Sequence, residues 1–173
     1  MGTAAPLVGR STVSGFAERT RRNLAYIEQA HAQSEGERVH LVTQIVNSLL
    51  GLVVFPYGYF LGNQAWRLAA TNQVLDELDW PRWKETEGQD LKKAKNLFDL
   101  IKYLRHGISH QHITFSGTDG LLSSDDPCPE NVVIKITSHE PKSQSKNWEG
   151  TMRASDVREF CERFGAWLKA TTE

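Results

Sequence analysis

Basic and titratable side chains are concentrated in one short segment, Tyr103–His112. Within it, Arg105 is followed at once by His106, and Ser109 precedes His110. Arginine keeps its positive charge at physiological pH, whereas imidazole gains or loses a proton near neutral pH. Such a group is suited to chemistry on a phosphate, because it can neutralise charge and move protons. We therefore take Arg105, His106 and His110 as candidate catalytic residues, with Ser109 in support.

Two histidines in this segment fit as the partner of Arg105. Four residues separate Arg105 from His110, and six residues separate Arg105 from His112. Both spacings suit an arginine and a histidine near the end of one helix, so spacing alone leaves the choice open. His106 and His110 share a helix face, since a helix advances about 100° per residue. His112 is kept as a supporting residue.

A structural role is the main alternative for this segment. Short spacings of this kind also arise by chance, so the motif needs context. Arg105 is able to cap the last carbonyl groups of a helix, and His110 is able to satisfy a turn. Mutation of His110 separates the two interpretations, because a catalytic histidine can be lost without loss of the fold.

Cofactor sites find little support in the sequence. His106 and His110 have the spacing of two zinc ligands on a helix, but the glutamate of an HExxH motif is missing. A third ligand would have to come from His112, Cys128, His139 or a nearby Asp, none at a characteristic distance. The sequence also contains no GxSxG motif and no phosphate-binding glycine loop. We expect no metal and no organic cofactor.

The candidate residues fall at the end of the most clearly amphipathic predicted helix. Its apolar residues recur every three or four positions, which is typical of a helix with one buried face: Leu91, Ala94, Leu97, Phe98, Ile101, Leu104 and Ile108. Its other side carries lysines that form a solvated or phosphate-facing surface: Lys92, Lys93, Lys95 and Lys102. Gly107 is expected to loosen the last turn.

Earlier helices are predicted from about Ser14 to Gln33, Arg38 to Phe55 and Asn63 to Leu78. After His112 the pattern alternates, which predicts strands near residues 112–116, 132–137 and 148–152. A final helix is expected after Ser155 as its N-cap.

The predicted fold class is therefore mainly α. It comprises a helical bundle at 12–111, a small antiparallel hairpin or sheet at 112–153 and a closing helix at 154–171, all in one domain of 1–173.

Composition limits the classes of partner. The net charge is −1 over 173 residues, so RNA binding would have to rest on a local surface or on oligomerisation. The two cysteines form no CxxC pattern and suit a reducing cytoplasm. No signal peptide is recognised at the start. Polar residues interrupt the uncharged stretch Val39–Trp66, so we expect a buried helix there rather than a membrane span.

The segment Leu97–His110 resembles the signature of the HEPN superfamily. Its mark is an arginine, then a polar residue, then a short gap to a histidine near a helix end, and Arg105, His106 and His110 fill those places in order. The apolar stretch Thr43–Leu52 is similar to the start of bacterial HEPN proteins encoded on plasmids and in genomes. The strand-rich tail and closing helix add to the resemblance, which covers most of the chain.

The resemblance implies a helical bundle that forms a homodimer and brings two Arg–His motifs into one cleft. Many HEPN proteins are metal-independent endoribonucleases in toxin–antitoxin, CRISPR or anti-phage systems, with an antitoxin or defence protein as partner. Others are non-catalytic modules that bind RNA, nucleotide or protein. Some toxins of the superfamily carry a modified Tyr two residues after the histidine. That place is His112 here, so this control is not expected.

These residue types suit RNA cleavage by the substrate's own 2′-hydroxyl. The reaction needs a base for the hydroxyl proton, an acid for the leaving 5′-oxygen and a cation for the charge on phosphorus. His110 is the candidate base or acid, and Arg105 offers two parallel donors to the phosphorane oxygens. His106 would orient the phosphate or carry the second proton, and Ser109 would hold His110 in place.

Overall fold

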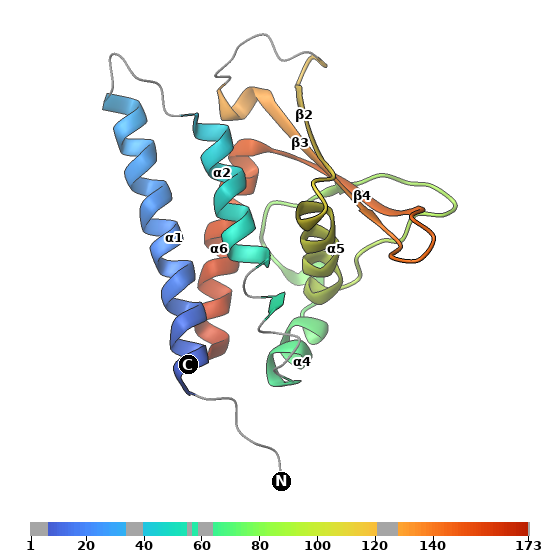
Figure 1. Ribbon diagram of the computed structural model, residues 1–173, viewed down its shortest axis with the longest axis horizontal. Helices are drawn as coiled ribbons and strands as arrows, with labels where there is room; N and C mark the ends of the chain where they lie inside the picture. Colours follow the sequence, from blue (N-terminus) through green and yellow to red (C-terminus); the bar gives the residue numbers. More distant parts are fainter. Residues whose placement is uncertain (1–6, 34–39, 55–56, 59–63, 121–127, 173) are drawn as a thin grey trace.

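The computed structural model describes residues 7–33, 40–54, 57–58, 64–120 and 128–172. Three of its helices form one layer, α1 (Leu7–Gln33), α2 (Leu41–Leu49) and α6 (Ala154–Thr172), which contact one another and lie side by side in Figure 1. α2 continues into a π-helical turn at Leu50–Val54. Among the described residues, no helix is long and apolar enough to cross a membrane.

The motif helix α5 (Leu97–Ser109) packs against the sheet and against the π-helical turn. α4 (Gln64–Asn72) lies against α5, and a 3₁₀ turn at Leu75–Glu77 follows it. Figure 1 shows α5 on the other side of α2 from α1, next to the strands.

The sheet has four antiparallel strands in the order β1-β4-β3-β2. They are β1 (Lys84–Glu85), β2 (Ile113–Gly117), β3 (Val132–His139) and β4 (Lys146–Arg153). Residues of β3 alternate between buried and more exposed positions, as the sequence pattern predicted. The predicted class, mainly α with a small antiparallel sheet between α5 and α6, is confirmed. One strand was missed, because β1 precedes α5 and its two residues carry no alternation.

The predicted start of the motif helix was wrong. α5 begins at Leu97, where Asn96 is the N-cap and its side chain accepts a hydrogen bond from the Asp99 backbone N–H at 2.9 Å. Leu91 and Ala94 precede the helix, and the Ala94 N–H donates to a Glu85 carboxylate oxygen at 2.9 Å. The apolar spacing continued upstream, but the cap and these tertiary hydrogen bonds hold the chain in another path.

Other boundaries differ by smaller amounts. α1 begins earlier than Ser14, and the third helix ends at Asn72 instead of Leu78. α6 starts at Ala154, so Ser155 lies inside the first turn rather than at the N-cap. Predicted helix ends at Arg38, Phe55 and Asn63 lie outside the described residues.

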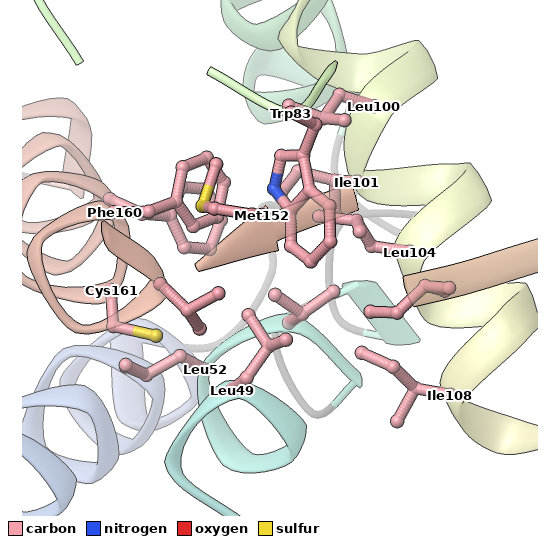
Figure 2. Close-up of a cluster of buried hydrophobic side chains, with 14 of the residues drawn as sticks. Leu49, Leu52, Trp83, Leu100, Ile101, Leu104, Ile108, Met152, Phe160 and Cys161 are labelled. Atoms are coloured by element: carbon pink, nitrogen blue, oxygen red, sulfur yellow. The ribbon is translucent and has the colours of Figure 1, made fainter. Parts of the chain in front are cut away.

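One hydrophobic cluster joins the helical layer, α5 and the sheet. Figure 2 shows Leu49 and Leu52 facing the buried side of α5, with Phe160 and Cys161 of α6 beside them. Leu49, Leu97, Leu104, Ile134 and Trp148 are fully buried members of this cluster, and the apolar stripe of α5 lies inside it. Burying each such side chain contributes about 1.5–3 kcal/mol, so the cluster fixes the helix against rotation.

Gly107 is the point of closest approach between α5 and β3. A Cβ atom at this position would lie 2.4 Å from Ile136 Cγ2 and 2.7 Å from the Thr137 carbonyl oxygen. Both distances are far shorter than van der Waals contact, and the second neighbour is backbone that cannot rotate away. The sequence predicted that Gly107 loosens the last turn of the helix. Its role in the structure is different, because the missing side chain permits α5 to contact β3 directly.

We expect Gly107→Ala to lower the free energy of unfolding by about 1–3 kcal/mol, because an extra methyl group must push α5 off β3. Urea denaturation monitored by circular dichroism measures this. Gly165→Ala is the matched control, since Gly165 is in α6 and a Cβ there would meet nothing within 4 Å. It is expected to be neutral or slightly stabilising, by up to about 1 kcal/mol. Equal stabilities of the two variants would contradict the close-packing argument.

Candidate functional site

The C-terminal end of α5 reverses direction in a Schellman motif. The Gln111 N–H donates to the Ile108 carbonyl at 3.1 Å, and the His112 N–H donates to the Gly107 carbonyl at 2.8 Å. Gln111 has a φ of 60°, in the left-handed region that glycine usually occupies at this place. The turn folds the chain back on the helix, so His112 returns to the side on which His110 lies.

Four imidazoles meet beside this turn. The ring centroids of His106 and His110 are 4.5 Å apart, those of His110 and His112 are 6.0 Å apart, and those of His112 and His139 are 4.2 Å apart. Three of the rings come from α5 and its turn, whereas His139 comes from the end of β3. We call these four residues the histidine cluster. Its members are half-buried or exposed, with His110 exposed.

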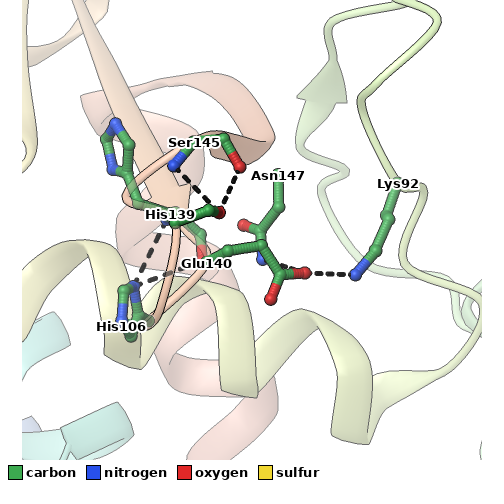
Figure 3. Close-up of polar contacts among 8 residues, drawn as sticks. Lys92, His106, His139, Glu140, Ser145 and Asn147 are labelled. Carbon is green, nitrogen blue, oxygen red and sulfur yellow. Dashed lines mark hydrogen bonds and ion pairs between the residues drawn. The ribbon is translucent and has the colours of Figure 1, made fainter.

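His106 is held by the strand. Its Nδ1 lies 3.4 Å from the Ser138 hydroxyl and 3.4 Å from the His139 backbone N–H. Figure 3 shows His106 on α5 beside the segment that carries His139. Because a backbone N–H can only donate, Nδ1 is the acceptor and the ring proton of the neutral form is on Nε2. Partial burial lowers the pKa of His106, and the neighbouring His110, Arg105, His112 and His139 lower it further. His106 is therefore a neutral hydrogen-bond donor at neutral pH.

Arg105 lies on the adjacent side of α5, with its guanidinium carbon 5.6 Å from the ring centroid of Tyr57. Tyr57 is buried, and burial raises the pKa of its phenol, while the charges of Arg105 and Arg67 oppose that rise. A cation–π contact of this length favours this position of the charged group, and the N–H groups of an arginine in such a contact can still donate to an anion. Arg105 itself is only half-buried, so solvent reaches it.

The other predicted residues have different surroundings. Ser109 is exposed, and its hydroxyl makes no hydrogen bond to another described residue, so its role in holding His110 stays a prediction. His110 is instead placed by its backbone, whose N–H donates to the His106 carbonyl at 3.2 Å. Among the described residues, no group of three His, Cys, Asp or Glu side chains is arranged to hold a metal ion.

Sequence reasoning considered His139 only as a remote metal ligand. The structure places its Nδ1 2.9 Å from Nδ1 of His112. Partial burial, His112 and Lys146 lower the pKa of His139. A signal was present in the sequence, since His139 ends an alternating strand that follows the motif, but only the pairing of β2 with β3 brings it to the cluster.

Lowered pKa values at His106 and His139 give a stability that depends on pH. A histidine whose pKa is lower in the folded state than in the unfolded chain stabilises the fold above its ordinary pKa of 6.5 and loses this effect as the pH falls through the folded value. We expect the unfolding free energy to fall between pH 7 and pH 5. A double variant, His106→Gln with His139→Gln, should show a smaller fall in urea titrations, whereas His40→Gln, at an exposed site outside the cluster, should match the wild type. A double variant with an unchanged pH slope would contradict this.

The left-handed Gln111 suggests a second test of the turn. Replacing it with glycine removes a backbone cost of about 1–2 kcal/mol, offset by the entropy of glycine in the unfolded chain. We expect Gln111→Gly to be stabilising by up to about 1 kcal/mol, which thermal denaturation measures. Gln111→Val should be destabilising, because a β-branched side chain tolerates this region poorly. Loss of stability in both variants would argue against the Schellman geometry.

Comparison with known proteins gives a family but no individual relative. The model of the family described as HEPN pEK499 p136 matches residues 3–173. The chain matches no curated protein and no solved structure. The family match includes α5, its terminal turn and the sheet that supplies His139, and the resemblance to the HEPN superfamily is confirmed. Since the match extends over nearly the whole chain, the protein belongs to the HEPN pEK499 p136 family.

Proposed function

We propose that this chain is a metal-independent endoribonuclease of HEPN type, which cleaves RNA through its 2′-hydroxyl in a cleft shared by two copies. HEPN-type domains are often ribonucleases or related to nucleotides, and they often bind RNA and form dimers. The observation that carries the proposal is the solvent-accessible histidine cluster beside Arg105 at the end of α5.

The contacts and exposure of each residue suggest its role in the proposed reaction. Arg105, held over Tyr57, would donate to two oxygens of the phosphorane and offset its negative charge. His106, a neutral donor through Nε2, would orient the phosphate. His110 is exposed at the end of the helix and would take the proton of the 2′-hydroxyl. The 2′-oxygen then bonds to phosphorus, the bond to the 5′-oxygen breaks, and an acid protonates that oxygen.

A second copy would strengthen the site. One chain offers one Arg105 and carries a net charge of −1, so its general field does not attract RNA. A two-fold dimer that joins two clusters would double the local positive charge, while the net charge of the whole dimer would remain negative. We place the activity in toxin–antitoxin or anti-phage defence, where an antitoxin or another defence protein would cover the cleft.

The test is cleavage of an end-labelled structured RNA by purified protein in EDTA. We expect products with 2′,3′-cyclic phosphate ends, and a loss of about 100-fold or more in rate for Arg105→Ala and for His110→Ala. Arg163→Ala and His40→Ala are matched controls, because Arg163 is exposed and pairs with Glu159 on α6, and His40 is exposed at the start of α2. Both should cleave at the wild-type rate.

Two results would contradict the nuclease proposal. Cleavage that continues in folded Arg105→Ala and His110→Ala would point to a contaminant. No cleavage by any form, with the protein free of copurified partner, would favour a non-catalytic HEPN dimer. RNA, nucleotide or protein binding by that dimer would then depend on Arg105.

A further inference from the structure

His112 and His139 face each other through like atoms. Their Nδ1 atoms are 2.9 Å apart, which is the length of a hydrogen bond between two nitrogens. Only one hydrogen fits in that space, so one ring carries a proton on Nδ1 while the other presents a lone pair. The two neutral imidazoles must therefore be opposite tautomers, and each fixes the proton position of the other.

The backbone leaves this pair little freedom. The His112 carbonyl oxygen accepts a hydrogen bond from the Thr137 N–H at 3.0 Å. The backbone N–H of His112 donates to the Gly107 carbonyl oxygen. His139 pairs with Lys146 across the strands, next to an irregularity between Ser138 and His139. Backbone hydrogen bonds at His112 and strand pairing at His139 thus restrain both residues of the Nδ1–Nδ1 contact.

Such a pair holds one additional proton but not two. A first proton converts the contact into an imidazolium–imidazole hydrogen bond, which is stronger than a neutral one. A second proton would place two N–H groups against each other at 2.9 Å. Lys146 on β4 opposes it as well, because its positive charge, together with burial and His112, lowers the pKa of His139. The other cationic or titratable groups near the pair are Arg105 and His106 on α5 and His110 at the helix end. Glu140, the nearest carboxylate in sequence, is already paired with Lys92 at 2.5 Å (Figure 3).

We propose that His139 is a positioning residue that shares one proton with His112 and so makes His112 the general acid of the cluster. The inference rests on the proposed ribonuclease function. In the acid step, the singly protonated pair gives one proton from Nε2 of His112 to the 5′-oxygen as its bond to phosphorus breaks. The pair returns to the neutral state, and His110 holds the proton taken from the 2′-hydroxyl. One proton therefore enters the cluster at His110 and one leaves from the pair. The starting state returns when His110 releases its proton to solvent and the pair takes up one proton from solvent.

The decisive experiment combines a titration without substrate and a rate profile with substrate. Long-range ¹H–¹⁵N spectra of the ¹⁵N-labelled full chain in EDTA, from pH 5 to pH 8.5, report the tautomer and protonation of each histidine. We expect opposite tautomers at His112 and His139 at high pH, and two proton-binding steps separated by more than about one pH unit. His139→Ala should leave His112 with a single independent step.

His139→Asn is the matched variant, because the amide can hydrogen bond to His112 near the position of Nδ1 but cannot hold a proton. It should keep the wild-type fold and stability while losing the shared titration. In both variants, the acid-dependent limb of the pH profile of kcat/KM should shift by about one pH unit relative to the wild type. A merely structural role for His139 would instead be rescued by Asn, with the profile unchanged.

The outcomes separate the two proposals. Equal tautomers or independent titrations of His112 and His139 would overturn the shared proton, whether or not RNA is cut. A shared titration together with a kcat/KM pH profile that is the same in His139→Asn and the wild type would overturn the positioning role alone. A shared titration without cleavage by any form would overturn the ribonuclease, and with it the catalytic use of the pair.

Discussion

The close contact between α5 and β3 at Gly107 is the constraint on which the site depends. Because the side chain is absent, the helix lies directly on the Ile136 methyl group and the Thr137 carbonyl. That depth allows the Thr137 N–H to bind the His112 carbonyl and brings His139 within reach of His106 and His112. A helix held even 1 Å farther from the strand would lengthen the hydrogen bonds that join the histidines.

Crowding of like groups is the second property of the site. His106 and His139 both have a lowered pKa, chiefly because each is partly buried, and positive neighbours add to this. Protonation of a neighbouring imidazole therefore makes protonation of His106 or His139 more difficult. A bound phosphate would raise the pKa values of these imidazoles, because a negative charge among them favours their charged forms. Proton uptake on binding of a phosphate would suit the proposed acid–base reaction at phosphorus.

Parts of this arrangement could be read from the sequence and parts could not. The apolar stripe predicted the buried face of α5 and the alternation predicted β3, because both patterns repeat over several residues. The start of α5 was missed since Leu91 and Ala94 keep the helical spacing, and only the Asn96 cap ends the pattern. β1 was missed because it pairs with β4 over two positions, Lys84 with Thr151 and Glu85 with Gly150.

At the site, too, some features could be predicted from the sequence and others could not. Arg105, His106 and His110 are near neighbours in the sequence, so helical geometry predicted their proximity. The contact of His139 with His112 spans 27 positions and exists only through the register of two strands. Gly107 was predicted to loosen a turn because glycine ends many helices. Its true constraint comes from Thr137, a residue 30 positions away that no local pattern identifies.

The end of α5 does not need Arg105 or His110 for a structural role. In such a role, Arg105 would cap the last carbonyl groups of the helix and the His110 side chain would satisfy the turn. Backbone N–H groups already bind the carbonyls of His106, Gly107 and Ile108, so the helix end needs no side chain to satisfy them. The hydrophobic cluster likewise closes without the imidazoles, which lie outside it and remain accessible to solvent. Four neighbouring rings outside the hydrophobic cluster, beside an arginine placed over Tyr57, therefore support the proposed role of this helix end in binding an anionic substrate.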